Sequence, residues 1–313
     1  MKAVVVEHLN GFGSLKDIPV PRPGSHEILV RVTAAGVNPI DWKRRDHADE
    51  KFPFVLGQDF AGVVSETGAG VRKYREGERI FGVAAGDDGA YAEYTLADED
   101  GREPIAKIPD SVGDADAAAL PTAGLTALAA IEAMHVGKDT TLLVLGATGG
   151  VGSFAVQIAR DRGAHVIGTG SAANEGYARS LGADEFVAYD REDVVEAVKA
   201  AHPNGVDAAL DLVDDADAIK KLATVLRGGG SIVSTTRAAD AAWFEQRKIV
   251  AQNLYVGGSP QWSHAGLRKL LELFERGAIR VTIAGERPLS EAVAALDESK
   301  RGSVTGKLVI TVA

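Results

Sequence analysis

The chain has 313 residues, of which 45% are hydrophobic and 25% are charged, and these ordinary values indicate a folded globular protein of about two domains. Its 34 Lys and Arg stand against 44 Asp and Glu, and the resulting net charge of −10 argues against binding to nucleic-acid phosphates or to an anionic membrane surface. The chain contains no cysteine, which excludes disulfides, thiol nucleophiles, iron–sulfur clusters and four-cysteine zinc sites.

Short strand-like runs separated by Pro- and Gly-rich turns dominate the first 115 residues. The runs are AVVV, EILVRVTAAGV, AGVVSETG, RIFGVA and YAEYTLA, and they predict an irregular β-rich domain. The N-terminal segment holds one basic residue and no small-residue cleavage site, so we expect a first strand here instead of a signal peptide, and a cytoplasmic location. Residues 140–159 carry no charge, but four glycines interrupt them, and we expect no membrane span.

From about residue 116 strands alternate with helices. A helix-like segment over 114–134 precedes the apolar run TLLVLG, and the alternation continues through the helix ADAIKKLATVLRGGG to the strand-like NLYVGGS. Such alternation predicts right-handed βαβ units and a doubly wound, Rossmann-like parallel sheet, so the fold class is α/β. A helix, HAGLRKLLELFERG, and a strand, GKLVITV, close the chain. The strand is a candidate edge strand of the first domain.

A glycine-rich turn lies between a predicted strand and a predicted helix, the context that marks a dinucleotide fingerprint. Gly149 would let the backbone approach a pyrophosphate, and Gly152 would allow close packing of the helix. Ala147 replaces the first glycine of the usual G-x-G-x-x-G pattern. The alternative is a glycine turn without a ligand. The expected contacts of the turn are Ala147, Thr148, Gly149, Gly150, Val151 and Gly152.

The residues at the end of the second strand of this domain indicate whether the cofactor is NADH or NADPH. An acidic residue there would bind the ribose 2′-hydroxyl of NAD, but the strand ends in Gly170 and Ser171 and no acid follows before Glu175. We therefore expect NADPH in preference to NADH, with Ser171, Asn174 and Arg179 available to the 2′-phosphate. Arg179 could equally be a solvated helix residue.

Six segments are informative together, namely AAGVNPIDWKRR (34–45), LGQDFAGVV (56–64), GAYAEYTL (89–96), LPTAGLTAL (120–128), LGATGGVGSFAVQIAR (145–160) and GKLVITV (306–312). In this order they resemble the zinc-free quinone oxidoreductase (ζ-crystallin-like) group of the medium-chain dehydrogenase/reductase superfamily. The resemblance implies a GroES-like catalytic domain from residues 1–115 and 260–313, a Rossmann-like domain from 116–259, and a substrate cleft between them.

The same resemblance locates the positions at which zinc-dependent relatives hold their catalytic metal. These positions are Asn38, Gln58 and Thr122 here, and none offers a thiolate or an imidazole. The seven histidines include no pair at metal-ligand spacing. We therefore expect no metal site. Without a Lewis acid to stabilise an alkoxide, reduction of a quinone or an enone is favoured over alcohol oxidation.

The resemblance also implies candidate residues for catalysis. Asn38 would donate its amide to substrate or cofactor, and Asp41 would organise the loop. Lys43 would place a cation near the developing enolate or relay a proton, unless residues 43–45 are simply a solvated basic run. Trp42 stands where group members carry a tyrosine, and it could wall an apolar pocket. The resemblance also implies that Thr122 and Thr126, which precede the first strand of the Rossmann-like domain, lie near the nicotinamide. Further cofactor contacts are expected at strand ends, namely Gly170, Val213 and Thr235.

These observations predict an NADPH-dependent, metal-free oxidoreductase that transfers hydride to small electrophilic quinones or α,β-unsaturated carbonyls. The alternatives are a pathway-specific enoyl reductase and a non-catalytic NADPH-binding sensor. We expect neither nucleic-acid nor membrane partners, and a homodimer that could form through an edge strand such as NLYVGG.

Overall fold

The structure is a computed structural model that describes residues 1–46, 51–302 and 304–312. The chain divides into two compact units. The β-rich unit comprises Met1–Leu125, Pro260–Glu275 and Val281–Ala313, and the parallel-sheet unit comprises Thr126–Ser259 and Arg276–Arg280. The chain therefore alternates between the units, each of which is described below by itself.

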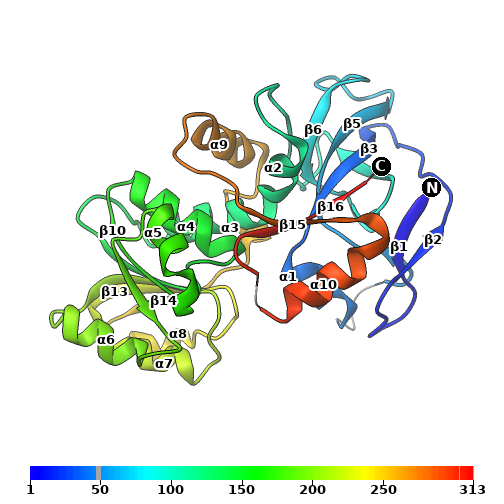
Figure 1. The fold of residues 1–313 in the computed structure, drawn as a ribbon. Helices are drawn as coiled ribbons and strands as arrows, with labels where there is room; N and C mark the ends of the chain where they lie inside the picture. Colours follow the sequence, from blue (N-terminus) through cyan, green and yellow to red (C-terminus); the bar gives the residue numbers. More distant parts are fainter. Residues whose placement is uncertain (47–50, 303, 313) are drawn as a thin grey trace. The chain divides into compact units, whose positions relative to one another are not determined.

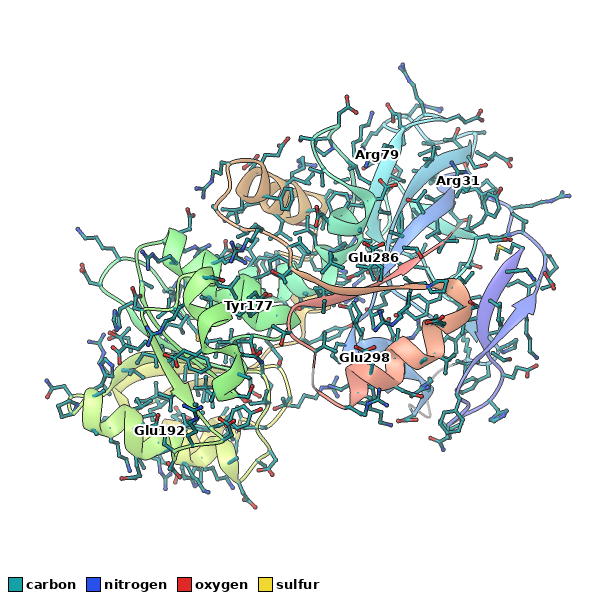
Figure 2. The ribbon with its side chains drawn as sticks, in the orientation of Figure 1. Arg31, Arg79, Tyr177, Glu192, Glu286 and Glu298 are labelled. Atoms are coloured by element: carbon teal, nitrogen blue, oxygen red, sulfur yellow. The ribbon has the colours of Figure 1, made fainter. Side chains whose placement is uncertain are left out.

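The chain first changes units inside helix α3 (Pro121–Ala133), later than the expected position near residue 115. The reason is that α2 (Asp114–Ala119) packs on the strands of the β-rich unit. Arg79, labelled in Figure 2, holds the start of this helix by donating from Nε to Asp114 over 3.1 Å.

Two sheets make up most of the β-rich unit. In the larger sheet the order is β15-β16-β3-β5-β6-β8, with β7 also paired to β3, and the smaller sheet has the order β2-β1-β4. The strands of the larger sheet are β3 (Glu27–Gly36), β5 (Asp59–Thr67), β6 (Arg79–Val83), β7 (Tyr94–Asp98), β8 (Ile105–Lys107), β15 (Ile283–Pro288) and β16 (Lys307–Thr311). Those of the smaller sheet are β1 (Lys2–Val6), β2 (Ser14–Asp17) and β4 (Phe54–Val55).

The C-terminal strand β16 returns to the β-rich unit but does not lie at its edge. It pairs with β3 on one side and with β15 on the other, as Figure 1 shows for the red strand beside the blue one. The expected edge position was wrong because β15, a strand that the sequence pattern did not reveal, covers the outer side of β16. The inner position buries Lys307, the first residue of β16.

Three further helices belong to the β-rich unit. These are α1 (Pro39–Arg45), α9 (His264–Glu275) and α10 (Ala292–Lys300). Helix α10 contacts α1 and β16, and its buried Ala292, Ala295 and Leu296 join the main hydrophobic cluster of the unit. Burial of this apolar face supplies the driving force that holds α10 on the sheet.

The parallel-sheet unit confirms the predicted α/β, Rossmann-like fold. All neighbouring strands are parallel, and their order β11-β10-β9-β12-β13-β14 is that of doubly wound dinucleotide-binding sheets. The strands are β9 (Thr141–Leu145), β10 (His165–Gly170), β11 (Glu185–Ala188), β12 (Val206–Asp211), β13 (Leu226–Ser234) and β14 (Val250–Asn253).

Helices cover both faces of this sheet. Figure 1 shows α4 and α5 on one side and α6, α7 and α8 on the other, as right-handed crossovers from a central strand require. The helices are α4 (Gly150–Asp161), α5 (Glu175–Leu181), α6 (Val194–Ala201), α7 (Ala218–Lys221) and α8 (Ala241–Glu245). Short 3₁₀ helices extend three of the connections, η1 (Ala172–Asn174), η2 (Leu222–Thr224) and η3 (Val256–Gly258).

Three predicted elements differ from those observed. The helix over 114–134 is divided at Pro121, whose nitrogen cannot donate to the preceding turn. The predicted helix ADAIKKLATVLRGGG ends at Thr224, and its LRGGG segment belongs to β13, because Val206 and Leu226 pair across the sheet. The last strand covers Val250–Asn253 instead of NLYVGGS, and Gly257 and Gly258 lie in η3.

Across the residues that the structure describes, no helix is both long and apolar enough to cross a membrane.

Candidate active site and dinucleotide turn

Asn38 immediately precedes helix α1 and is almost completely buried. Its extended backbone turns the end of β3 into the helix, and Pro39 provides the preset φ that suits a first helical position. The backbone N–H of Asn38 donates to Oδ2 of Asp41 over 2.8 Å, so Asp41 satisfies a donor at the helix start. This contact fixes the loop around Asn38.

The side-chain amide of Asn38 is held at both ends. Its Oδ1 accepts from Nζ of Lys307 over 2.5 Å, and its Nδ2 donates to Oδ2 of Asp59 over 2.8 Å. Lys307 also donates to the carbonyl oxygen of Val37 over 2.7 Å. A cation on one side and a carboxylate on the other permit only one orientation of the amide. One of its two N–H groups is used by Asp59, and the other has no partner among the described residues.

Asp59 joins Thr122 to this cluster. Its Oδ1 accepts from Oγ1 of Thr122 over 2.6 Å, and its Oδ2 accepts from the backbone N–H of Thr122 over 3.0 Å. Lys307, Asn38, Asp59 and Thr122 thus form one chain of hydrogen bonds, which we call the Asn38 cluster. All four residues lie in the β-rich unit, on strands β16 and β5, the loop before α1 and the first turn of α3.

Burial governs the protonation of this cluster. It lowers the pKa of Lys307 from its ordinary value, although Asp59 and Asp41 act in the opposite direction. It raises the pKa of Asp59, against the effects of Lys307 and of the hydrogen bonds from Thr122 and Asn38. A buried ammonium and a buried carboxylate bridged by one amide form a dry, strongly polar centre in which each charge is stabilised chiefly by the other.

Asp41 links the cluster to Tyr91. The hydroxyl of Tyr91 donates to Oδ2 of Asp41 over 3.0 Å, whereas Oδ1 of Asp41 is buried without a hydrogen-bond partner. Burial raises the pKa of Asp41 to about 7, and the hydrogen bonds from Asn38 and Tyr91 oppose this rise. Burial together with Asp41 raises the pKa of Tyr91 well above its usual range. A proton on the unpartnered Oδ1 would give the neutral acid that this burial favours.

Lys43 lies on α1 and is exposed. Its Nζ stands 5.5 Å from the centre of the Trp42 ring, and Nζ of Lys300 stands 5.2 Å from the same ring. Trp42 packs against the main hydrophobic cluster of the unit, with its buried Nε1 unpartnered. The interpretation of residues 43–45 as a solvated run is wrong for Arg45, which is buried and donates to the carbonyl of Phe12 over 3.2 Å.

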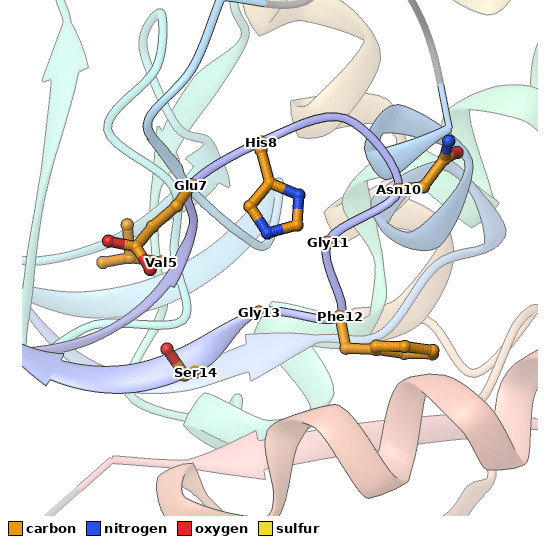
Figure 3. Close-up of a pocket in the computed structure, with 8 residues that line it drawn as sticks. All are labelled: Val5, Glu7, His8, Asn10, Gly11, Phe12, Gly13 and Ser14. Atoms are coloured by element: carbon orange, nitrogen blue, oxygen red, sulfur yellow. The ribbon is translucent and has the colours of Figure 1, made fainter.

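A hollow of about 260 Å³ in the β-rich unit does not coincide with these residues. Figure 3 shows it beside the loop between β1 and β2. Its volume is below the range of about 300–1,000 Å³ that is typical of small-molecule sites. None of the expected site residues lines it; the lining consists of Val5, Glu7, His8, Asn10, Gly11, Phe12, Gly13 and Ser14.

In the parallel-sheet unit the glycine turn connects β9 to α4. Gly146 has a φ of +79°, which opens the turn, and a β-carbon on Gly152 would lie 2.1 Å from the carbonyl oxygen of Gly146. Only glycine fits at 152. Gly149 differs, because a β-carbon there would meet nothing closer than 3.6 Å. The space above Gly149 is therefore open to a ligand, and the free N–H groups at the start of α4 suit a pyrophosphate. Ala147 and Thr148 are buried within the turn, and Gly150 and Val151 begin the helix.

The end of β10 lies next to this turn. A β-carbon on Gly170 would meet Oγ1 of Thr148 at 3.4 Å, which places the two segments in contact. Ser171 follows, partly exposed, and Asn174 ends η1. The guanidinium of Arg179 is engaged elsewhere, with Nε donating to Glu175 over 3.0 Å.

Arg179 also extends toward the amino ends of the strands. Its Nη1 donates over 3.1 Å to the carbonyl of Asp184, which precedes β11. Ser171, by contrast, follows the carboxyl end of β10. The structure thus places Gly170 beside the glycine turn, with Ser171 next to it in the chain, while Arg179 is held in contacts of its own.

The carboxyl ends of β12 and β13 complete the ligand-facing edge of the sheet. Asp211 is fully buried and accepts from the backbone N–H of Val213 over 3.1 Å and from the hydroxyl of Ser234 over 2.7 Å. This leaves Val213 62% exposed beside Gly146. The backbone N–H of Thr235 donates to the carbonyl of Asp211 over 3.0 Å. Thr126, on α3, is buried.

Comparison with known proteins agrees with this architecture. Residues 24–110 match the family described as Alcohol dehydrogenase GroES-like domain, and residues 181–310 match the family described as Zinc-binding dehydrogenase. The chain is 33% identical over 307 residues to the Chloroplast envelope quinone oxidoreductase homolog of Arabidopsis thaliana, covering 94% of this chain and 92% of that protein. The chain belongs to the zinc-free quinone oxidoreductase group of the medium-chain dehydrogenase/reductase superfamily.

Two further similarities extend over nearly the whole chain. The NADPH-dependent alkenal/one oxidoreductase of Arabidopsis thaliana chloroplasts is 30% identical, covering 99% of this chain and 79% of that protein. The structure of Escherichia coli quinone oxidoreductase complexed with NADPH has a TM-score of 0.90 at 25% identity and covers 99% of this chain and 100% of that one.

The residues at the zinc-ligand positions of the superfamily do not fit a catalytic zinc ion in this chain. Oδ1 of Asn38 already accepts from a cation, Lys307, and Oγ1 of Thr122 donates to Asp59. Gln58 offers only an amide, a poor substitute for the imidazole or thiolate that zinc prefers. Lys307 therefore supplies the positive charge at this centre.

Three members of the site were not anticipated from the sequence. They are Asp59, Tyr91 and Lys307, none of which is among the site residues expected from the sequence. The one available signal was the presence of a lysine at the start of the otherwise apolar strand KLVIT. A charged residue opening a strand is ordinarily solvated, so the pattern alone did not distinguish it.

Proposed function

We propose that the protein is an NADPH-dependent, zinc-independent reductase that transfers hydride to quinones or to α,β-unsaturated carbonyl compounds. The β-rich unit takes the catalytic role, and the parallel-sheet unit binds the dinucleotide. The relatives named as quinone and alkenal/one oxidoreductases support this assignment.

The glycine turn supports binding of NADPH. The open space at Gly149 and the helix start at Gly150 would hold the pyrophosphate, and the exposed Val213 would contact an aromatic ring of the cofactor. When bound, NADPH supplies the hydride. Ser171 and Asn174 would contact the 2′-phosphate. Arg179 would have to leave Glu175 to do so.

The observation that carries the reductase assignment is the Asn38 cluster. Its amide is fixed by Lys307 and Asp59, and one of its N–H groups has no partner among the described residues. A fixed donor of this kind stabilises negative charge that develops on an acceptor oxygen. The same contacts already engage Asn38 and Thr122, which supports a zinc-independent reaction. An acceptor that is already electron-poor can be reduced without a Lewis acid. Its reduction depends mainly on positioning and on one hydrogen-bond donor to the acceptor oxygen.

We assign Asp41 the role of loop organiser, which its hydrogen bond to the backbone of Asn38 supports. Lys43, in contrast, contacts Trp42 and none of the residues of the Asn38 cluster in this structure. Its role as a cation near the enolate remains a prediction.

The experiment that tests the function is an NADPH-oxidation assay of the purified protein with a panel of quinones, alkenals and cyclic enones. We expect turnover with at least one class of acceptor and a lower affinity for NADH than for NADPH. Tight NADPH binding without turnover on any acceptor would instead support a sensor. A strong preference for acyl-CoA or acyl-carrier substrates would support a pathway-specific enoyl reductase.

We also propose a homodimer and a cytoplasmic location. The dimer is supported by β14, an edge strand of the parallel sheet with Val250 68% exposed and Tyr255 63% exposed just beyond it. Sedimentation analysis tests it, with Val250→Lys expected to shift the protein toward monomer. Fractionation of the producing cells tests the location.

A further inference from the structure

Two histidines and a glutamate converge in the parallel-sheet unit, although they lie far apart in the sequence. Nε2 of His165 is 2.6 Å from Oε1 of Glu185, and Nε2 of His202 is 3.1 Å from the same oxygen and 3.2 Å from Oε2. The three potential ligand atoms all lie within 4.8 Å of one another. Within residues 1–46, 51–302 and 304–312, no other group of three or more such side chains meets this criterion.

The fold itself brings these side chains together. His165 opens β10 and Glu185 opens β11, and the two strands are parallel neighbours with Ile167 paired to Glu185. Residues 165 and 167 point to the same face because side chains alternate along a strand. Helix α6 covers that face through Val198, and its last turn ends at His202.

The cluster lies away from the dinucleotide turn. His165 and Glu185 are at the amino ends of their strands, whereas the glycine turn follows the carboxyl end of β9 in the same parallel sheet. The two sites are therefore at opposite edges of the sheet. A ligand held by this cluster would not take part in hydride transfer.

We propose that His165, Glu185 and His202 form a binding site for a divalent transition-metal ion of the zinc type. Two imidazole nitrogens and one carboxylate are a donor set that Zn²⁺ takes, with a water in the fourth position. Bond lengths of about 2.0–2.1 Å place tetrahedral ligands roughly 3.4 Å apart. The two contacts of His202 are close to that separation, and the His165–Glu185 contact must lengthen by less than about 1 Å. The two imidazole nitrogens, which lie within 4.8 Å of one another, must adopt a similar separation.

The surroundings of the cluster suit a cation that enters from solvent. The side chains of His165, Glu185 and His202 are 43%, 37% and 21% exposed. Oδ2 of Asp184 lies 3.7 Å from Nδ1 of His165 and adds negative charge, although Arg160 pairs with the other oxygen of Asp184 at 3.1 Å. The ion would tie β10, β11 and α6 together. The bound ion would thereby stabilise the parallel-sheet unit.

This proposal revises the expectation that the histidines provide no metal ligands. That expectation rested on spacing along the sequence. The site instead depends on strand pairing and on the end point of a crossover helix, neither of which a ligand-spacing motif encodes.

The test is a titration of the full-length, chelator-treated protein with ZnCl₂, followed by calorimetry, and with CoCl₂, followed by visible ligand-field absorption. We expect about one Zn²⁺ per chain and a zinc-dependent rise in unfolding temperature. His165→Gln, His202→Gln and Glu185→Gln should each weaken binding at least about tenfold, since even the loss of an outer-shell partner has an effect of that size. The double variant His165→Gln/His202→Gln should lose the thermal shift.

His26→Gln is the matched control. His26 is also an exposed histidine beside a carboxylate, with Nδ1 3.2 Å from Oδ2 of Asp100, but it lies in the other unit. The His26→Gln variant should bind Zn²⁺ as the wild type does. Two results would overturn the proposal, namely no Zn²⁺ binding by the wild type, or undiminished binding by the double variant. Circular dichroism and NADPH binding check that each variant is folded.

Discussion

Nζ of Lys307 lies 2.5 Å from Oδ1 of Asn38, although 269 residues separate them in the sequence. The contact joins the last strand of the chain to the loop before its first helix. Because both residues are buried, the amide orientation at the proposed active site depends on a charge supplied by the C-terminal segment.

Removal of this charge should be costly. We expect Lys307→Met to lower the free energy of unfolding by about 3–5 kcal/mol, because Asp59 would be left as an uncompensated buried charge. Denaturant unfolding measures the loss. Lys307→Met/Asp59→Asn should recover part of it, whereas Lys300→Met, at a half-exposed position of the same unit, should change stability little. Equal effects of the two lysine substitutions would contradict a buried role for Lys307.

Asp41 should make stability depend on pH. Its pKa is raised to about 7 by burial, so the folded chain retains a proton that the unfolded chain releases near pH 4. The folded state binds more protons between these values, and stability should therefore fall as the pH rises from about 4 to about 7 and level off above. Asp41→Asn mimics the neutral acid.

The comparison of wild type with Asp41→Asn isolates this contribution. Urea unfolding at several pH values measures the free energy of unfolding of both proteins. Between about pH 4 and about pH 7 this free energy should fall by a few kcal/mol less in the variant than in the wild type. The variant should keep the acceptor for the backbone N–H of Asn38. Parallel pH profiles for the two proteins would show that Asp41 is ionised throughout.

Local patterns in the sequence were sufficient to predict the fold class of the parallel-sheet unit and the place of its glycine turn. Glycines between a strand and a helix, followed by repeated β–α alternation, define a turn whose geometry is set by neighbouring residues. Gly146 and Gly149 lie in this turn, and Gly152 lies in the first turn of the helix that follows it. The right-handed crossover rule then determines which face of the sheet each connecting helix covers.

The polar cluster could not be predicted in the same way. Asn38, Asp59, Thr122 and Lys307 meet only because β16 inserts beside β3, and β16 occupies that place only because β15 covers its outer side. Each residue by itself has an ordinary solvated interpretation. Tertiary pairing of strands distant in the sequence decided their burial, and no single segment carries that information.

The two glycines of the turn should respond differently to alanine. Gly152→Ala places a β-carbon 2.1 Å from a backbone oxygen, so we expect a loss of about 1–3 kcal/mol in stability as well as weaker NADPH binding. Gly149→Ala makes only an ordinary contact, with its β-carbon 3.6 Å from the carbonyl oxygen of Gly146, and should leave stability nearly unchanged. It should still raise the Kd for NADPH at least about tenfold, since the methyl occupies space assigned to the pyrophosphate.

Thermal denaturation and fluorescence titration separate the two effects. Wild-type NADPH affinity in Gly149→Ala would show that the cofactor does not approach this backbone.

Cofactor preference should depend on Ser171 more than on Arg179. Ser171→Asp adds a carboxylate at the end of β10, which should repel a 2′-phosphate and lower NADPH affinity relative to NADH by at least about tenfold. Arg179→Gln should have a smaller effect, because the guanidinium is already engaged by Glu175 and by the carbonyl of Asp184. Titration of both variants with NADPH and with NADH measures these affinities. A larger loss of NADPH affinity in Arg179→Gln than in Ser171→Asp would assign the 2′-phosphate to Arg179.

Lys43 and Lys300 flank the Trp42 ring at similar distances, 5.5 and 5.2 Å, and so provide a matched pair for the proposed catalytic cation. If Lys43 stabilises the developing enolate, Lys43→Met should reduce kcat about 10²-fold with little change in NADPH affinity, an effect comparable to removal of one oxyanion donor. Lys300→Met removes an equivalent cation–π contact and should leave kcat unchanged. Steady-state kinetics with a quinone and an enone measures both. Equal, small effects of the two substitutions would show that Lys43 only packs on Trp42, and the fixed amide of Asn38 would then remain as the proposed donor to the acceptor oxygen.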